Sequence, residues 1–274
     1  MFIFFHILIF IFGLFIGSFL NCVIWRLHQK KSFLMERSIC PHCKHQLAWF
    51  DLIPIISFIL LKGKCRYCHK PISWQYPLVE LATAFLFILP FIVQNFVSLP
   101  FSRELIVPEI LYYFFFVSVS IIIFVYDLKY LIIPDKVLFP ALFITFLYYL
   151  TRSLILFFYY SDQKAFLILL YHLLSAISVS GFFLFLYLIS KGKWIGFGDV
   201  KLSFFLGFVL GWPKVIPWIF LTYIIGGIIG IGLIVFKKKS LKSQIPFGPF
   251  LISASLIAFF FGNELLTYYL NLLI

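Results

Sequence analysis

Residues 110–129 read ILYYFFFVSVSIIIFVYDLK, seventeen uncharged residues followed by the first charge, Asp127. A helix of roughly 20 apolar residues crosses the hydrocarbon core of a bilayer, which is about 30 Å thick. The stretch therefore predicts a transmembrane helix that ends beside an aspartate. Because a charge near hydrocarbon is costly, an ionisable residue in this position indicates a functional site with a partner elsewhere in the chain.

The composition extends this prediction to the whole molecule. The chain is 63% hydrophobic and 12% charged, with a mean hydropathy of +1.08, whereas a soluble domain is about 45–50% apolar and about 25% charged. We therefore predict an all-α, polytopic membrane protein with about eight transmembrane helices. The sixth is expected to be short or kinked because of Pro213 and Pro217. The expected spans are residues 2–24, 77–98, 110–126, 137–158, 166–189, 201–217, 218–236 and 247–271.

The basic residues are concentrated in loops between these spans. Of the 22 Lys and Arg residues, 18 fall in segments 26–76, 127–136, 190–201 and 236–245. Since Lys and Arg accumulate in cytoplasmic loops, we expect all four segments to face the cytoplasm and both termini to face outward. The net charge of +12 is then a signal of topology, and no nucleic-acid partner is expected.

A second aspartate, Asp199, ends the sequence GFGD at residues 196–199. Two predicted spans separate it from Asp127, so the chain leaves the cytoplasmic face and returns, and the two carboxylates can meet. Two carboxyl groups held close share a proton; the ionised one can activate water while the protonated one donates to a carbonyl oxygen. The pair predicts an aspartic protease. Taken singly, Asp199 is equally well interpreted as a helix cap and Asp127 as an ion pair with Lys129.

Three further residues are expected to support this pair. Gly196 and Gly198 lack side chains, so they would let the backbone bend tightly and approach a peptide substrate closely. Asp135 stands just before the fourth predicted span, where we expect it to cap the helix or support the site rather than react.

The loop at residues 26–76 carries two C-x2-C pairs, Cys40–Cys43 and Cys65–Cys68. This is close to the spacing of a four-thiolate zinc site, which is closed and structural. Disulfides are the alternative, but a cytoplasmic loop is kept reduced. Between the pairs, residues 49–61 read WFDLIPIISFILL. That run is too short to span comfortably, so we expect an interfacial or re-entrant segment lying against the membrane.

With these residues assembled, the chain is similar to the bacterial prepilin peptidases, also called type IV leader peptidases, which are polytopic GxGD-type aspartic proteases. The similarity covers nearly the full length. Besides the four cysteines and WFDLIPIIS at 49–57, it is carried by GSFLN at 17–21 with Arg26, GKCRYC at 63–68, YPLVE at 76–80, residues 127–135 ending in IPD, GFGDVKL at 196–202 and PFGP at 246–249.

The resemblance implies a specific activity. Such enzymes remove the basic leader of type IV prepilins and secretion pseudopilins at the cytoplasmic face of the bacterial inner membrane, and Asp127 and Asp199 match their catalytic pair. Members with the cysteine-bearing loop also methylate the new N-terminal amine with S-adenosylmethionine. Glu80 and Asp51 are the acids to test for binding the donor or the amine. Their alternatives are an interfacial acid paired with a loop lysine and a helix cap.

Four parts of the chain are expected on this basis. They are a first transmembrane helix at 1–25, a cytoplasmic zinc-binding loop domain at 26–76, a second transmembrane helix with an outer loop at 77–109, and a GxGD peptidase membrane domain at 110–274.

Three other classes of protein remain as alternatives. A presenilin-like intramembrane protease uses the same aspartate motifs but cuts deeper in the bilayer. A proton-coupled transporter also contains intramembrane carboxylates, although no repeated halves are visible here. A docking scaffold of a pilus or secretion machine would keep the cysteines and leave the aspartates idle.

Overall fold

The computed structural model describes residues 2–30, 37–93, 106–161, 164–236 and 245–273. Within these ranges the protein is helical, with two isolated antiparallel bridges and no β-strand. Parts of the predicted segments lie outside the described residues, namely 31–36 of the zinc-binding loop, 94–98 of the second span with 99–105 of the outer loop, and 237–244 of the last basic segment. The elements are α1 (Phe2–Gln29), η1 (Trp49–Leu52), α2 (Ile56–Leu60), α3 (Gln75–Val93), α4 (Ile106–Tyr130), α5 (Asp135–Tyr160), α6 (Ala165–Ser190), α7 (Phe197–Leu210), α8 (Val215–Val235) and α9 (Gly248–Leu273).

Seven of these helices are long and apolar enough to cross a membrane, namely α1, α3, α4, α5, α6, α8 and α9. The predicted sixth span is also a helix, α7, but its 14 residues extend about 21 Å at 1.5 Å per residue, less than the hydrocarbon thickness of about 30 Å. It ends at Gly211, where φ is +68°, and Pro213 follows. The prediction that this span is short is confirmed, and the number of candidate full spans is seven rather than eight.

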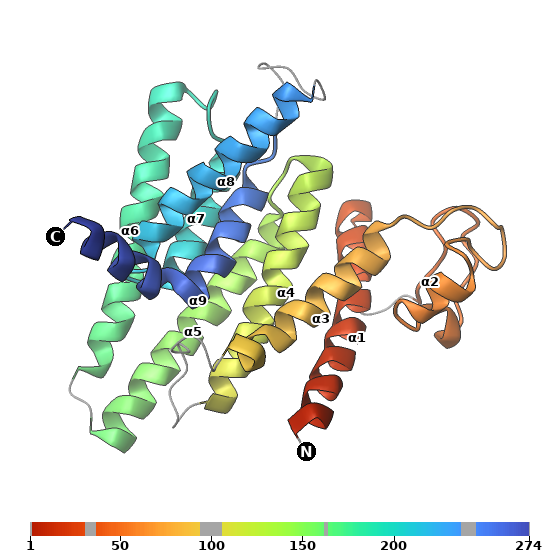
Figure 1. Ribbon diagram of the computed structural model, residues 1–274, viewed down its shortest axis with the longest axis horizontal. Coiled ribbons are helices and arrows are strands. Elements are labelled where there is room, and N and C mark those ends of the chain that lie inside the picture. Colours follow the sequence, from red (N-terminus) through yellow and green to blue (C-terminus); the bar gives the residue numbers. More distant parts are fainter. Residues whose placement is uncertain (1, 31–36, 94–105, 162–163, 237–244, 274) are drawn as a thin grey trace. The chain divides into compact units, whose positions relative to one another are not determined.

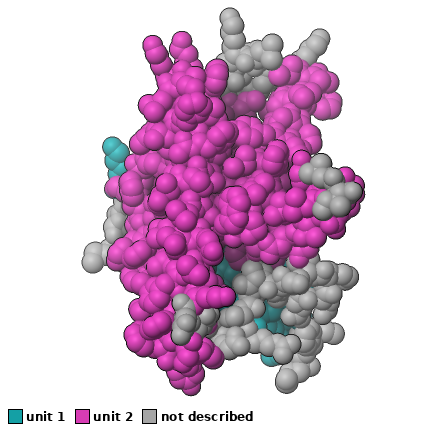
Figure 2. Space-filling model, turned by 90° about the vertical axis from the view of Figure 1, so that its left-hand side faces the viewer, with its two compact units in different colours: residues 1–122 teal, residues 123–274 magenta. Residues whose placement is uncertain are grey.

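The chain divides into two compact units, residues 1–122 and 123–274, and the division falls within α4. Figure 2 gives the two units different colours. In the first unit α1 packs directly on α3. A Cβ at Gly13 would lie 2.6 Å from Ala84 Cα, and one at Gly17 would lie 2.6 Å from Glu80 Cα. Two glycines on one face of α1 therefore let the backbones of two membrane helices touch, as small residues do in membrane interfaces.

In the second unit α5 to α9 pack against one another, with α7 in contact with α5, α6 and α9. Gly207 of α7 faces the backbone of α6, since a Cβ there would lie 3.1 Å from Ala176 Cα. The core between α8 and α9 is fixed by the buried Trp218, whose Nε1–H donates to the Leu251 carbonyl at 2.9 Å. The buried face of α7 is thus covered by its neighbours, which lets a short helix be held inside the unit.

The helices of this unit alternate in direction. Figure 1 shows the end of α4, the start of α5, the end of α6 and the start of α7 at the same, upper end of the unit, where α9 also begins. The turns at 131–134 and 191–196 therefore meet at this end, together with residues 245–247. Both predicted catalytic aspartates lie next to these turns.

Candidate active site and metal centre

Asp127 lies in the last turn of α4, and its side chain is buried, with 4% of the residue exposed. Its Oδ2 accepts a hydrogen bond of 3.0 Å from the N–H of Gly248, the first residue of α9. The first N–H groups of a helix have no partner within the helix and carry its positive dipole end. The alternative of an ion pair with Lys129 is not what the structure shows; α9 supplies the partner of this carboxylate.

The glycine at 248 leaves room for the Asp127 carboxylate. A Cβ at this position would lie 2.6 Å from Asp127 Oδ2, closer than real Cβ contacts, and 3.3 Å from Asp127 Cγ, so the carboxylate or the start of α9 would have to shift. The prediction of the site from sequence did not include this residue, and its only signal there was the PFGP motif. The structure thus adds α9 to the elements that shape the site.

Asp199 lies in the first turn of α7 and is partly buried. Its Oδ2 accepts a hydrogen bond of 3.1 Å from the Gly196 N–H, while its own N–H donates to the Gly196 carbonyl at 3.0 Å. The helix-cap interpretation of Asp199 is therefore confirmed, because its side chain accepts the N–H of Gly196, the residue before α7. Asp127 and Asp199 lie at the same end of the unit, because a Cβ at Gly198, next to Asp199, would lie 3.4 Å from the side chain of Ile133, in the turn that follows α4. Pairing of the two carboxylates stays a prediction.

The glycines before Asp199 do not bend the chain in the way expected. Gly196 has an extended backbone, with φ −76° and ψ 151°. A Cβ would lie 3.4 Å from Asp199 Oδ2 at Gly196 and 3.4 Å from the Ile133 side chain at Gly198, which are ordinary contacts. Neither position needs a glycine for the fold. Of the two roles predicted for these glycines, only the close approach of a substrate stays a prediction.

Asp135 is the first residue of α5, and Pro134 occupies the capping position before it. The expected helix cap at Asp135 is therefore wrong, because the chain enters α5 one residue earlier. Its carboxylate instead forms an ion pair with Lys201 of α7. The ion pair joins the start of α5 to the first turns of α7, two residues beyond Asp199, which fits the alternative expectation that Asp135 supports the site.

The cysteine-bearing loop contains two turns of the same shape. In the first, the Cys40 N–H donates to the His45 carbonyl at 3.0 Å and the Lys44 N–H donates to the Cys40 carbonyl at 2.9 Å. In the second, Cys65 and His69 make the equivalent bonds, both at 2.9 Å. Lys44 and His69 also share a positive φ, 59° and 57°. The two C-x2-C motifs thus form a repeated turn that aims both thiols of each pair the same way.

The Sγ atoms of Cys40, Cys43, Cys65 and Cys68 all lie within 4.8 Å of one another. A tetrahedral zinc site with Zn–S bonds of about 2.3 Å separates its sulfurs by about 3.8 Å, so small movements would bring these thiols to a common metal ion. The four cysteines can hold a metal ion without an open position. No disulfide joins them in the described structure.

The ionisation of the thiols agrees with such a role. Burial opposes ionisation of Cys40, but the backbone N–H groups of Cys43 and His42 lower its pKa to about 7. The Lys70 N–H would lower the pKa of Cys68, whereas burial and the neighbouring thiols raise it to about 11. A divalent cation bound by the four sulfurs would stabilise the thiolate form of both Cys40 and Cys68, because a coordinated thiol is deprotonated outright.

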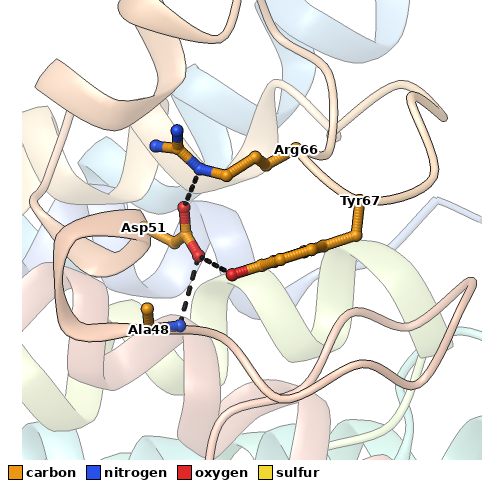
Figure 3. Close-up of polar contacts among 4 residues, drawn as sticks. All are labelled: Ala48, Asp51, Arg66 and Tyr67. Atoms are coloured by element: carbon orange, nitrogen blue, oxygen red, sulfur yellow. Dashed lines mark hydrogen bonds and ion pairs between the residues drawn. The ribbon is translucent and has the colours of Figure 1, made fainter.

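Asp51 is bound to the second cysteine turn (Figure 3). Arg66 Nε–H donates to its Oδ1 at 2.8 Å, and the Tyr67 hydroxyl and Ala48 N–H donate to its Oδ2 at 3.0 and 3.2 Å. Burial by itself would raise the pKa of Asp51, but the bonds from Arg66 and Tyr67 outweigh burial and lower it. The cap interpretation is confirmed by the Ala48 bond, and the other two bonds attach η1 to the metal-binding turn.

Glu80 is buried in the second turn of α3. Its Oε2 accepts a hydrogen bond of 2.8 Å from the Ile55 N–H, so its partner is the backbone of the loop and not a loop lysine. Ile55 has φ 62° and ψ −49°, a conformation that β-branched residues rarely adopt. The two acids therefore hold opposite sides of one short segment, Asp51 from the metal-binding turn and Glu80 from α3.

Comparisons with known proteins agree with this arrangement. The type IV leader peptidase family model matches residues 114–231, and the bacterial peptidase A24 N-terminal domain matches residues 11–94. The prepilin leader peptidase/N-methyltransferase of Bacillus subtilis is 31% identical over 97% of this chain and 98% of its own length. This chain belongs to the type IV leader peptidase family.

Other relatives with the same name have similar extents. That of Aeromonas hydrophila is 31% identical over 96% of this chain and 93% of its own length, and that of Legionella pneumophila is 28% identical over 98% and 95%. No solved structure matches the chain. The type IV leader peptidase match contains Asp127, Asp135 and Asp199 but ends before Gly248, whereas the N-terminal match contains the four cysteines.

Proposed function

We propose that this protein cleaves the basic leader from prepilins and pseudopilins and then methylates the new N-terminal residue. Membership of the type IV leader peptidase family supports this, since the full-length relatives are named for both activities. The observation that supports the proposal is that Asp127 and Asp199 lie at one end of the same unit, where Asp127 contacts the start of α9 and Gly198, next to Asp199, lies against Ile133. The substrates would be anchored in the bilayer beside the helices.

The proposed reaction needs one proton shared by the two carboxyl groups. The ionised member takes a proton from water, and the resulting hydroxide attacks the scissile carbonyl carbon while the protonated member donates to the carbonyl oxygen. Collapse of the tetrahedral intermediate breaks the C–N bond, and the departing amine receives a proton from the carboxyl group that had accepted it from water. Backbone N–H groups of Gly248 and Gly196 hold the two carboxylates in place.

We propose zinc as the metal of the cysteine-bearing loop. Four thiolates from two C-x2-C turns fit a closed tetrahedral zinc site, in which the ion would be structural. Its contribution is to hold together a loop that is too small to build a large core of its own. The proposed cleavage requires no step at the metal.

The proposed methyl donor is S-adenosylmethionine, because the relatives are named as N-methyltransferases. Binding of the donor or the amine by Glu80 and Asp51 stays a prediction. The contacts of both acids give each one a positioning role within the loop.

We propose that the site lies at the cytoplasmic face of a bacterial inner membrane. Lys129, Lys191 and Lys193 lie beside the turns that carry the aspartates, and basic loops favour the cytoplasmic side. This location favours cleavage at the membrane boundary over cleavage deeper in the bilayer, the presenilin-like alternative. A transporter is less well supported, since the family is one of peptidases.

The proposal is tested with purified protein in detergent and a prepilin substrate. Asp127→Asn and Asp199→Asn should each reduce cleavage about 100- to 10,000-fold, as loss of a general acid or base does. Glu264→Gln, an exposed acid in α9, is the matched control and should cleave normally. Full cleavage by either aspartate variant would show that the two-carboxylate mechanism is wrong.

A further inference from the structure

The segment between the two cysteine turns exposes large apolar side chains. Trp49 is 78% exposed, Ile59 65% and Leu60 75%, and Trp74, which follows the loop, is 70% exposed. The Phe58 and Trp74 rings lie 5.1 Å apart, so α2 packs against the residue that precedes α3. An apolar surface of this kind on a loop rich in charged residues indicates a binding partner.

The contact with Glu80 sets the depth of this segment along the first unit. Glu80 lies five residues after the start of α3 at Gln75, about 7.5 Å along the helix axis. Its bond with the Ile55 N–H therefore holds the segment beside the first turns of a membrane-spanning helix. Figure 1 shows α2 to the right of α1 and of the first turns of α3. Amphipathic segments at a membrane surface lie about 5–10 Å deep, at the boundary of headgroups and acyl chains.

The segment is held at two points, near its start and in its middle. Asp51 attaches η1 to Arg66 and Tyr67 of the second cysteine turn, and Glu80 attaches Ile55 to α3. The unusual backbone of Ile55, with positive φ and negative ψ, persists only where the surroundings impose it. These contacts thus fix the backbone that carries the exposed apolar side chains.

The charges around the segment match one kind of partner. Exposed basic side chains on the same loop are Lys44, Lys62, Lys64, Arg66 and Lys70. Apolar and tryptophan side chains combined with nearby lysines are typical of segments that bind an anionic lipid surface. The apolar surface is also continuous along the chain with the membrane helix α3, through Trp74 and the exposed Leu78.

We propose that residues 49–61 are a membrane-surface anchor, which inserts its apolar side chains at the boundary of an anionic leaflet and is positioned by Asp51 and Glu80. α2 has only five residues, so the segment lies on the bilayer and does not cross it. This function is separate from the proposed cleavage. It gives the two acids a task that depends on the metal-binding loop and not on a methyl donor.

The test uses the full-length protein in lipid nanodiscs containing phosphatidylglycerol. A photoreactive amino acid replaces Ile59 or Leu60, and mass spectrometry detects lipid adducts after illumination. The same replacement at Lys44 or Gln46, both exposed on the first cysteine turn, is the matched control. We expect adduct yields at Ile59 and Leu60 at least several-fold above the control positions, and a lower yield in discs of zwitterionic lipid alone.

Two variants then test the anchor residues. Glu80→Ala removes the acceptor for the Ile55 N–H and should reduce the lipid adduct at Ile59 several-fold, whereas Glu80→Gln keeps a carbonyl acceptor and should retain it. Yields at Ile59 and Leu60 no higher than at Lys44 would overturn the proposal, as would cross-links to a second copy or to added prepilin in place of lipid. Because no step measures cleavage, this result is independent of the proposed peptidase activity.

Discussion

At the scale of single residues, the glycine that starts α9 is as constrained as the aspartates. Gly248→Ala places a Cβ 2.6 Å from Asp127 Oδ2, so either the carboxylate or the start of α9 has to move. A displacement of about 1 Å in a catalytic group can cost roughly 100-fold in rate. We therefore expect Gly248→Ala to reduce prepilin cleavage by about that factor in an assay of initial rates.

The control for this variant is Gly227→Ala. Gly227 lies in α8, and a Cβ there meets nothing within 4 Å, so cleavage and yield of folded protein should stay at the wild-type level. If Gly248→Ala cleaved as fast as Gly227→Ala, the contact between α9 and Asp127 would have no role in the site.

The sequence predicts some of these residues better than others. Asp127 and Asp199 are visible because each is a charge at the edge of an apolar stretch, and the spans between them predict that they can meet. Gly248 is 121 residues from its partner, and the PFGP motif that contains it does not indicate which residue it contacts. The contact depends on where α9 begins in space, which hydropathy does not specify.

At the scale of elements, the link between η1 and the second cysteine turn should be measurable. Asp51→Ala removes the acceptor of three hydrogen bonds while the Arg66 and Tyr67 groups remain. Bonds that involve a charged partner contribute about 1.5–3 kcal/mol each when they are well formed, less where a partner such as Arg66 is half exposed. We expect faster tryptic cleavage within residues 60–70 in limited proteolysis, with normal insertion of the membrane helices.

Asp51→Asn separates charge from hydrogen bonding in this link. The amide keeps a carbonyl acceptor but loses the ion pair with Arg66. Its proteolysis rate should lie between those of the wild type and Asp51→Ala. Equal rates for all three proteins would mean that η1 is held by other contacts.

The cysteine-bearing loop gives a second prediction at this scale. Cys40→Ser and Cys65→Ser each remove one of four ligands, so we expect metal analysis to find about one zinc per wild-type chain and much less in either variant. The loop should become sensitive to protease, while the aspartate pair keeps some cleavage activity. Cys22→Ser, in α1 and outside the thiol cluster, is the control. Well-folded wild-type protein without zinc would contradict the assignment.

The elements themselves were largely predictable, including the shortness of α7, but the residue at which α7 ends was not. Seven long apolar stretches became helices long enough to span, because their composition leaves a helix as the way to satisfy the backbone in lipid. α7 is shorter because Gly211 and Pro213 end it, and the Lys214 amine is satisfied there by the Phe259 carbonyl at 2.8 Å. That bond is a tertiary contact, so the average hydropathy of a stretch of sequence cannot predict where α7 ends.

At the scale of the whole molecule, hydropathy and charge predict the topology but not the division into compact units. The two units meet inside α4, between Ile122 and Ile123, in the middle of an unbroken apolar stretch. Nothing in the composition of α4 changes there. The boundary follows from which residues the two ends of the helix contact, and that information is not in the local sequence.

The topology yields a final prediction that is independent of the site. α3 and α4 lie between the cysteine-bearing loop and the turn at 131–134, and α5 and α6 lie between that turn and the turn at 191–196. Two crossings return the chain to its starting face, so all three segments should be accessible from one side. The short α7 comes after the turn at 191–196, so it does not change the number of crossings between these three segments.

Trypsin added to inside-out membrane vesicles should therefore cut at Arg66 and at Lys191 or Lys193, which are exposed. The same sites should resist trypsin in right-side-out spheroplasts until detergent is added. Cleavage at Arg66 and Lys193 from opposite sides would show that one of the helices α3 to α6 does not cross. Cleavage of all the sites in spheroplasts would instead reverse the orientation, and would place the aspartate pair on the face where a cytoplasmic leader peptide cannot reach it.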